Sequence, residues 1–471
     1  MDALQARVSL GAFRVAAFVL AAASACAAGA EEPEAHQPKP DYTALIEAKK
    51  SYAIPAAEIA AFQFLLNRVD RGLYGKDYDS TWGSIKRNLH DNWVTDNDPF
   101  KINQFGHPYA GSMYFGFARS AGLSFWESFG YAFAGSTVWE IAGEATPPSK
   151  NDQISTGVAG SFLGESLFRM ANLVLEQGQG NSFWREVAAG VISPPMAFNR
   201  HAMGGRFSEI LNSHDPVYYS RVQLGTSATT RSEAGPSRAP KRHEVLADFS
   251  MDYGLPGKGG YHYDRPFDYF SFQATGSTAN VVETLSTRGL LLGTDYEAGE
   301  RYRGLWGLYG SYDYLNPQLF RLSSTALSLG TTGQFMISDA LALQGTLMAG
   351  GGYAAVGTVH GTDDLSYHYG VTPQALAALR LIVGKKAALD LTAREYFVSG
   401  VAGTNGGHDN IARLDLTFTY RIYKEHAIAL KYLWSRRDAT FPGLSDLSQT
   451  RGTIGLYYVM LGHDGFGVVS Y

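Results

Sequence analysis

From about residue 217 onward, apolar and polar residues alternate along the chain with a period of two. The segment 413–422 shows this most clearly, because one of its faces is apolar and the other is charged or hydroxylated. The apolar face consists of Leu414, Leu416, Phe418, Tyr420 and Ile422, and the polar face of Arg413, Asp415, Thr417, Thr419 and Arg421. Side chains alternate across a strand, so the pattern predicts β-strands with one apolar and one wet surface.

About twelve runs of this kind are expected. They start near residues 217, 242, 266, 281, 301, 320, 340, 366, 386, 408, 426 and 449. Most are long enough to cross a bilayer as tilted strands, which takes roughly 9–11 residues. An even number of strands, their aromatic ends and the closing Tyr471 are typical of outer-membrane barrels.

We therefore predict an α+β membrane protein in which residues 213–471 form an antiparallel transmembrane β-barrel of about 12 strands, with a range of about 10–14. The alternative is a large soluble β-sandwich or barrel. It fits less well, because strands in globular proteins have a typical length of roughly 5–6 residues.

Between residues 101 and 212 the apolar spacing is helical, which predicts a compact helical domain. Three helices are expected over residues 108–121, 124–145 and 151–176. The first begins at Pro108, a favoured first-turn residue, and the second begins with a capping box of Ser124 and Glu127. Small residues recur four positions apart, which lets helices approach closely. They are Ser112, Gly116 and Ser120 on the first helix, and Gly157, Gly160, Ser161 and Gly164 on the third.

Ionisable side chains interrupt these apolar helices. The candidate site consists of His107, Glu140, Glu144 and Asp152, and Glu165 follows on the third helix. Buried charges are costly unless they are paired or functional. One interpretation is a His/carboxylate site that binds a metal, or that acts as general acid and base on a lipid or sugar headgroup. The other is that the carboxylates form ion pairs that hold the bundle together, with Arg119, Lys150 or Arg169.

Residues 1–30 have the features of a secretory signal peptide. Arg7 and Arg14 precede a short apolar stretch over 15–23, and the small residues 28–30 predict cleavage after Ala30. The single cysteine, Cys26, lies within this segment, where its alternative role is lipid attachment. Residues 31–41 are then expected to be a disordered, charged tether, and residues 42–100 a polar helical lead-in.

Composition narrows the class of protein. The net charge of −5 shows no basic excess, which argues against a nucleic-acid partner. Glycine (53) and tyrosine (28) are abundant, while charged residues make up 18% and the mean hydropathy is −0.14. This composition suits a transmembrane barrel, whose strands are half polar, and not a helical membrane protein. Four histidines of the barrel region, His262, His360, His368 and His408, are expected to be isolated surface residues.

A series of motifs over residues 90–205 resembles a known family. The motifs are Asp96-x-Asp98, Asn103, His107-Pro108, Trp139-Glu140, Glu144, Asn151-Asp152, Gly164-Glu165, Pro194 and Phe198-Asn199-Arg200. Their order is similar to that of the bacterial envelope family catalogued as domain of unknown function 3943. The resemblance covers under a third of the chain, and it implies an envelope location and a candidate site but no activity.

Two classes of function stay open. The first is an outer-membrane barrel of a Gram-negative bacterium with a channel, transport or envelope-maintenance role, whose helices form a plug or a periplasmic domain. Charges that would then line the lumen are Arg413, Asp415, Arg421, Lys431 and Arg436. The second is an envelope enzyme that acts on lipid or glycan through His107 and the three carboxylates.

In both cases we expect an exported protein of the cell outer membrane, in contact with outer-membrane lipid. We also expect it to meet the barrel-assembly machinery through its C-terminal Tyr471, and not to bind nucleic acid. The sequence identifies no cofactor.

Overall fold

The computed structural model describes residues 43–96, 98–177, 183–233, 241–357, 367–400, 406–463 and 465–471. These residues form two compact units, a helical one up to Ser213 and a β-barrel from His214 onward. The expected signal peptide, the tether, Cys26 and His360 lie outside the described residues.

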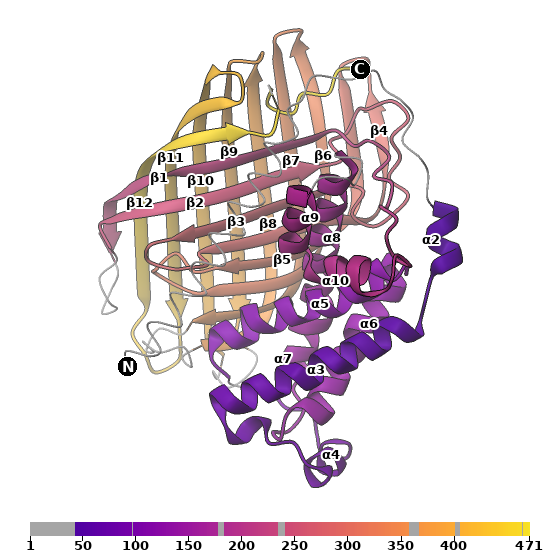
Figure 1. The fold of residues 1–471 in the computed structure, drawn as a ribbon. Coiled ribbons are helices and arrows are strands. Elements are labelled where there is room, and N and C mark those ends of the chain that lie inside the picture. Colours follow the sequence, from indigo (N-terminus) through magenta and orange to yellow (C-terminus); the bar gives the residue numbers. More distant parts are fainter. Residues whose placement is uncertain are drawn as a thin grey trace. The chain divides into compact units, whose positions relative to one another are not determined.

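The helical unit contains α-helices (Figure 1), with one 3-10 segment and three π-helical segments between them among the described residues. In chain order its elements are α2 (Thr43–Lys49), α3 (Ala53–Tyr74), η1 (Lys76–Tyr78), α4 (Trp82–Asn88), η2 (Ile102–Gly106), α5 (His107–Ser120), α6 (Phe125–Val138), η3 (Trp139–Gly143), α7 (Lys150–Asp152), η4 (Gln153–Ala159), α8 (Gly160–Gln177), α9 (Phe183–Ile192) and α10 (Pro194–Ala202). The π-helical segments are η2, η3 and η4. None of the described helices is both long and apolar enough to cross a membrane.

Helix starts follow the sequence signals, but two predicted helices are not continuous α-helices. The capping box of Ser124 and Glu127 is present in both directions, and α6 begins directly after it. The helix predicted over 124–145 is α-helical only to Val138, because its last turn, η3, is a π-helix. The helix predicted over 151–176 begins within the short helix α7 and continues through the π-helical η4 before α8 starts at Gly160.

The small residues allow α5 and the η4–α8 segment to approach closely, as predicted. A Cβ atom added at Gly111 would lie 1.9 Å from the backbone carbonyl oxygen of Thr156. One added at Gly160 would lie 2.6 Å from the Cα atom of Gly111. Both obstacles are backbone atoms, which cannot rotate away, so this crossing requires glycine at both positions. The crossing places the start of α5 beside η4.

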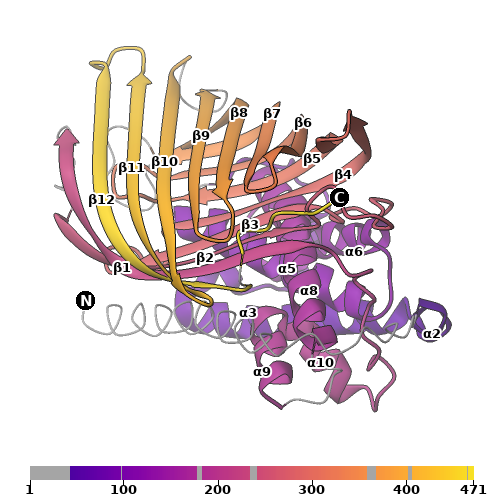
Figure 2. The same cartoon turned by 90° about the horizontal axis from the view of Figure 1, so that it is seen from above.

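The barrel consists of twelve antiparallel strands that close on themselves. They are β1 (Tyr218–Glu233), β2 (His243–Tyr253), β3 (Phe270–Ser277), β4 (Thr284–Ala298), β5 (Tyr302–Leu315), β6 (Leu322–Ser338), β7 (Leu341–Gly357), β8 (Tyr367–Val383), β9 (Ala387–Ser399), β10 (His408–Tyr423), β11 (His426–Thr440) and β12 (Leu447–Leu461). Each strand pairs with its sequence neighbours, and β12 pairs with β1 to close the wall (Figure 2). Every strand starts within four residues of its predicted start. The predicted barrel of about 12 strands is confirmed.

Apolar side chains form the outer surface of the wall. On β10, Phe418 and Tyr420 are each 45% exposed, whereas Thr417 and Thr419, which alternate with them, are fully buried. The same exposed apolar positions recur on neighbouring strands, at Leu327 and Leu329 of β6, Leu379 of β8, Leu430 of β11 and Leu456 of β12. Water does not favour an apolar surface that runs along so many adjacent strands, but the hydrocarbon core of a bilayer does. The barrel is therefore built to span a membrane.

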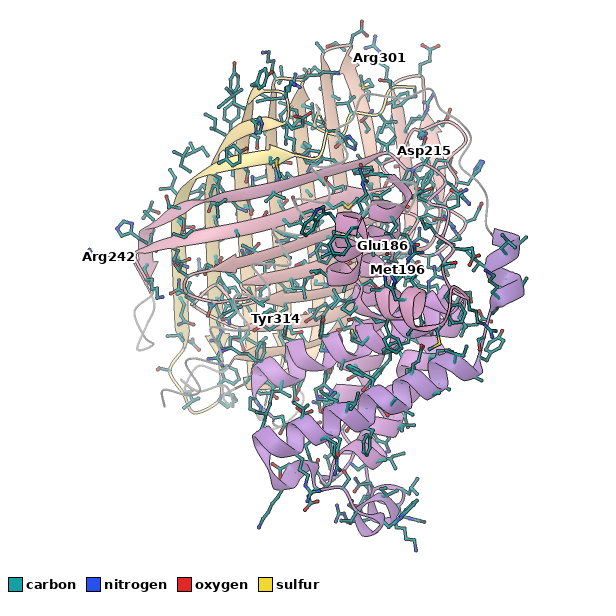
Figure 3. The ribbon with its side chains drawn as sticks, viewed as in Figure 1. Glu186, Met196, Asp215, Arg242, Arg301 and Tyr314 are labelled. Carbon is teal, nitrogen blue, oxygen red and sulfur yellow. The ribbon has the colours of Figure 1, made fainter. Side chains whose placement is uncertain are left out.

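The two ends of the barrel differ in their connections. At one end, tight turns over residues 299–301, 339–340, 384–386 and 424–425 join four pairs of strands, and a longer connection over 254–269 joins β2 to β3. Longer loops join strands at the other end, for example over 316–321 and 441–446. Figure 3 labels Arg301 at the short-turn end and Arg242, directly before β2, at the long-loop end.

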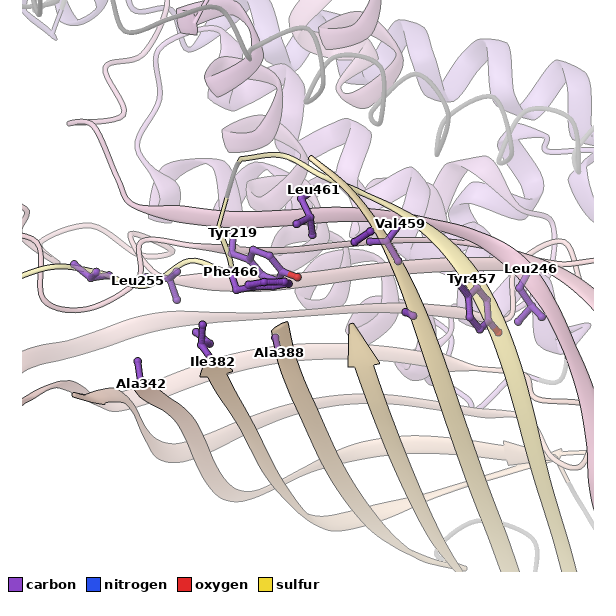
Figure 4. Close-up of a cluster of buried hydrophobic side chains, with 13 residues drawn as sticks. Tyr219, Leu246, Leu255, Ala342, Ile382, Ala388, Tyr457, Val459, Leu461 and Phe466 are labelled. Carbon is purple, nitrogen blue, oxygen red and sulfur yellow. The ribbon is translucent and has the colours of Figure 1, made fainter. Parts of the chain in front are cut away.

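The C-terminal segment continues beyond the last strand and folds back onto the barrel. β12 stops at Leu461, and Val469 then exchanges two hydrogen bonds with the inward-facing side chain of Gln334, at 2.6 and 3.0 Å. Phe466 packs near Tyr219 in an apolar cluster of the barrel (Figure 4), with 6.3 Å between the ring centroids. The Tyr471 hydroxyl donates to the carbonyl oxygen of Arg301. The segment is tied to the short-turn end of the wall, so its aromatic terminus is not a strand terminus.

Candidate functional site

The candidate residues of the helical unit lie next to its three π-helical segments. His107 directly follows η2, Glu140 lies within η3, and Asp152 directly precedes η4. The extra residue in a π-helical turn redirects the side chains that follow. Such turns are rare in proteins as a whole, but where they occur they often lie at functional sites. All three side chains are buried, with exposures of 7%, 1% and 0%.

These three side chains converge. One possible ligand atom from each of His107, Glu140 and Asp152 lies within 4.8 Å of the other two. His107 Nε2 is 4.0 Å from Asp152 Oδ2. The structure thus brings together three of the four predicted site residues, from three separate helical elements.

One polar atom of each of the three residues is held by a hydrogen bond. His107 Nδ1 is 2.9 Å from the hydroxyl oxygen of Thr156. Glu140 Oε2 accepts a hydrogen bond from the backbone N–H of Ser149, and Asp152 Oδ1 accepts one from the side-chain amide of Asn151. Glu140 Oε1 and Asp152 Oδ2, by contrast, are buried without a hydrogen-bond partner among the described residues.

Glu144, the fourth predicted residue, lies beside this group but is satisfied on both oxygens. Its Oε1 accepts a hydrogen bond from Trp139 Nε1 at 2.7 Å, and its Oε2 accepts one from the hydroxyl of Thr146 at 3.1 Å. Glu144 therefore adds negative charge next to the three converging residues, with no oxygen left unbonded.

Burial and mutual repulsion raise the pKa values of these carboxyl groups. Burial raises the pKa of Glu140 well above its ordinary range, and the charges of Glu144 and Asp152 add to it. Burial also raises the pKa of Asp152, helped by the carboxylate of Asp96. The pKa of Glu144 rises to about 7, mainly through burial and against the opposing effect of His107. Such displaced pKa values are typical of functional sites.

Two further carboxylates, Asp98 and Asp70, lie near this group and were not predicted as site residues. Burial raises the pKa of Asp98 to about 6, with a further contribution from Asp96, and His107 opposes it. Burial likewise raises the pKa of Asp70, on α3, to about 6. Asp98 stands in the motif that carries the family resemblance, which was a usable signal. Asp70 lies in a polar-looking helix and gave none.

The alternative ion pairs predicted for Glu140 and Glu144 are wrong for two of the three cations. Arg119 and Arg169 each bond Glu165 at 2.7 Å. Burial by itself would raise the pKa of Glu165, but the two guanidinium groups outweigh it and hold this pKa below its ordinary value. Lys150 is exposed, and the described residues show no ion pair for it. Glu165 is thus the paired, structural carboxylate of the bundle.

Charged side chains also cross the lumen of the barrel. Arg380 on β8 bonds Asp390 at 2.6 Å and Asp252 on β2 at 3.1 Å. The strands β8 and β2 are six places apart in the ring of twelve, so this link joins opposite walls. Arg221 on β1 contacts Asp390 at 2.8 Å, which extends the network to a third part of the wall. A cavity of about 150 Å³ remains beside these residues.

Two predictions about barrel residues need correction. Arg436 does not line the lumen, because it pairs in register with Ala412 on the outward face and is half exposed. Lys431 and Asp415 do face inward and form an ion pair at 2.8 Å. His368 is not a surface histidine, since it is buried 3.5 Å from Asp409.

The fold and these sites define a twelve-stranded membrane barrel preceded by a helical domain with a buried His/carboxylate cluster. Residues 92–195 match the family described as "Domain of unknown function (DUF3943)". The matched range contains His107, Glu140 and Asp152 and the nearby Glu144 and Asp98, but not Asp70. The resemblance drawn from the motifs is confirmed. None of the curated proteins matches the chain in sequence.

Among solved structures, the barrel is similar to outer-membrane proteins at low identity. The outer membrane channel DcaP of Acinetobacter baumannii is 9% identical, with 52% of this chain and 96% of that one covered and a TM-score of 0.26. The NanC porin is 6% identical, with coverages of 50% and 98% and a TM-score of 0.26. The toluene transporter TodX of Pseudomonas putida is 10% identical, with coverages of 53% and 90% and a TM-score of 0.22. At such scores the barrel assignment rests on the strand pairing of this chain.

Proposed function

We propose that this protein is an outer-membrane transport channel whose lumen, in the conformation described, is closed by ion pairs between opposite walls. The observation that carries the proposal is the ion pair of Arg380 on β8 with Asp252 on the opposite wall, while Asp390 on the adjacent strand β9 pairs with the same guanidinium group. An apolar outer wall around a charged interior is typical of barrels that pass water-soluble solutes. When the ion pairs of the lumen separate, water and mobile ions can solvate the freed charges. An apolar core that separated would gain no such interaction.

Two arginines of the lumen indicate the charge of the solute. Arg394 and Arg413 stand directly opposite each other on β9 and β10, although like charges in that relation repel. Among the described residues, Arg394 Nε and Arg413 Nε and Nη1 have no hydrogen-bond partner. Unsatisfied guanidinium groups favour anions. We therefore propose small anionic solutes.

Conductance of the purified full-length protein in planar lipid bilayers tests this proposal. We expect rare, small, anion-selective openings from the wild type, and openings that are several-fold more frequent or larger for Arg380→Ala. Arg394→Gln and Arg413→Gln should lower the anion selectivity. Arg436→Ala is the matched control, because this arginine faces outward, and it should behave as the wild type. Silence of both the wild type and Arg380→Ala, in samples whose barrels are folded by heat-modifiable migration, would contradict a transport role.

Location is tested separately. Fractionated cells should hold the mature chain in the outer membrane, beginning near Glu31, as the signal-peptide and barrel patterns predict. Recovery of a soluble periplasmic protein would contradict this.

The role of the helices as plug or periplasmic domain, and the alternative of an envelope enzyme, stay predictions. An enzyme would need to open the cluster first, because its four predicted residues are at most 7% exposed.

A further inference from the structure

We propose that His107, Glu140 and Asp152 bind one divalent transition-metal cation, of the Zn²⁺ or Mn²⁺ type. The site is independent of the transport function proposed above. It lies wholly within the helical unit. Glu140 lies in the π-helical segment η3, and His107 and Asp152 directly adjoin the segments η2 and η4.

The first argument is the geometry of the ligand atoms. The three residues offer atoms within 4.8 Å of one another. A metal with bonds of about 2.0–2.2 Å to nitrogen and oxygen separates its ligand atoms by roughly 3–4 Å. A shift of about 1 Å, which is within reach of these side chains by rotation, therefore closes the three residues on an ion.

The second argument is that each of the three residues has one polar atom held by a hydrogen bond, which leaves its other polar atom directed toward the group. The Thr156 hydroxyl holds His107 Nδ1, so Nε2 points toward Asp152 Oδ2. The Ser149 N–H and the Asn151 amide hold one oxygen each of Glu140 and Asp152. The other oxygens, Glu140 Oε1 and Asp152 Oδ2, are buried and have no donor among the described residues. Metal-binding histidines and carboxylates are oriented by outer hydrogen bonds of this kind.

The third argument is the sign of the charge. The groups that most affect Glu140 and Asp152 are other carboxylates, namely Glu144 and Asp96. Glu165, in the same domain, is surrounded by two guanidinium groups instead. A buried charge needs a counter-charge or a proton. A bound cation meets that need for Glu140 and Asp152 as the arginines do for Glu165.

The donor set selects the kind of cation. Imidazole suits Zn²⁺, Fe²⁺ and Cu²⁺, whereas carboxylate oxygen alone suits Mg²⁺, Ca²⁺ and Mn²⁺. Zn²⁺ accepts both imidazole and carboxylate ligands. Of the carboxylate-binding cations, Mn²⁺ is the first-row transition metal that also binds mixed nitrogen and oxygen sites, and we therefore name Zn²⁺ and Mn²⁺. The part of the chain that the structure describes contains no cysteine, so no thiolate there directs the site toward soft metals.

The experiment uses the full-length protein in detergent, treated with EDTA and dialysed. Titration with ZnCl₂ and MnCl₂ by calorimetry, with elemental analysis of the bound metal, should give one ion per chain. MgCl₂ and CaCl₂ should bind at least tenfold more weakly. Glu140→Gln and Asp152→Asn, which keep the shape of the side chain, should weaken binding tenfold or more. Thr156→Val removes the hydroxyl that holds His107 and should weaken it about tenfold.

Glu58→Gln is the matched control. Glu58 is also a buried carboxylate of the helical unit with an oxygen lacking a hydrogen bond, but it lies beside Asn199 and outside the cluster. This variant should bind the metal as the wild type does. Helical circular dichroism and heat-modifiable migration verify that each variant is folded, and metal should raise the melting temperature of the wild type but not of Glu140→Gln.

Wild-type protein that binds no ion, or that binds it as tightly as Glu140→Gln and Asp152→Asn do, overturns the proposal. In either case the carboxyl groups share protons rather than a metal. A barrel that conducts no ions in bilayers would leave this result unaffected, so the failure of one proposal is distinguishable from the failure of the other.

Discussion

The helical domain buries carboxylates in two different ways. Glu165 lies between Arg119 and Arg169, each at 2.7 Å, and its pKa is held low. Glu140 and Asp152 are equally buried but lie among other carboxylates, and their pKa values are raised. A buried carboxylate with its counter-charge in place stabilises a fold, whereas one without it stores repulsion that a ligand can relieve.

The barrel lumen belongs mostly to the first kind. Asp390, Asp409, Asp415 and Glu244 each have a cationic partner within 2.8 Å. Even there, Arg394 and Arg413 keep guanidinium nitrogens without a partner among the described residues. Pairing therefore distinguishes scaffold charges from candidate binding charges in both units.

The largest effect is expected from breaking the paired carboxylate. Glu165→Gln leaves two guanidinium groups buried without their counter-charge and should lower the free energy of unfolding by about 3–5 kcal/mol. Glu140→Gln removes one of several like charges and should leave the metal-free protein as stable as the wild type, or more stable. Chemical denaturation followed by helical circular dichroism compares the two. If Glu140→Gln unfolds as early as Glu165→Gln, the cluster is structural and the contrast is wrong.

A slightly smaller effect is expected at the outer wall. Phe418 lies on the exposed face near the middle of β10, so Phe418→Arg should cost about 2–4 kcal/mol in a bilayer. Phe418→Leu is the control, because it keeps an apolar side chain, and it should cost clearly less. Urea unfolding in lipid vesicles measures both. Equal tolerance of Arg and Leu would mean that this face does not contact lipid.

The third effect is a pH dependence of the helical domain. Burial raises the pKa of Glu58 from 4.5 to about 7. The folded state then binds more protons than the unfolded state between these two values, so stability falls as the pH rises from about 4.5 to about 7. Glu58 should contribute on the order of 2 kcal/mol to this fall. Unfolding of the wild type and Glu58→Gln at several pH values measures it, and the same slope in both would remove Glu58 as its source.

The smallest effect is expected at Arg436. This arginine and Asp438 are about half exposed, so Arg436→Ala should change the free energy of unfolding by less than about 1 kcal/mol. Its sequence neighbour Arg437 is buried and bonds Asp409 at 2.6 Å, so Arg437→Gln should be several-fold more destabilising. The two variants, unfolded side by side, check the alternation of outward and inward residues. Similar losses would contradict it.

The architecture of the barrel was accessible from the sequence because its signal is local. Each strand shows its two faces within its own residues, as at Phe418 and Thr417, and the twelve starts follow from this alternation. The capping box at Ser124 and Glu127 is local in the same way. The contacts of the last residues with Gln334 and Arg301 were not accessible, because they join positions far apart in the chain.

The candidate site was accessible only in part. The rarity of ionisable residues in apolar helices pointed to His107, Glu140, Glu144 and Asp152. The sequence did not show which of the four converge and which has both oxygens hydrogen-bonded. Glu144 differs from Glu140 in this respect only through its hydrogen bonds with Trp139 and Thr146. Asp70 could not be recognised at all, because its helix looks like an ordinary polar one.

By itself, the sequence determined which residues form strands and helices, which faces are apolar, and which residue types are candidates for chemistry. Only the tertiary structure decided which charges are paired. The reason is that pairing depends on the close approach of Gly111 and Gly160 and on three π-helical turns, which together direct His107, Glu140 and Asp152 to one point. The glycine crossing and the π-helical turns both depend on how segments distant in sequence pack against each other, and a local pattern of residues does not predict such packing.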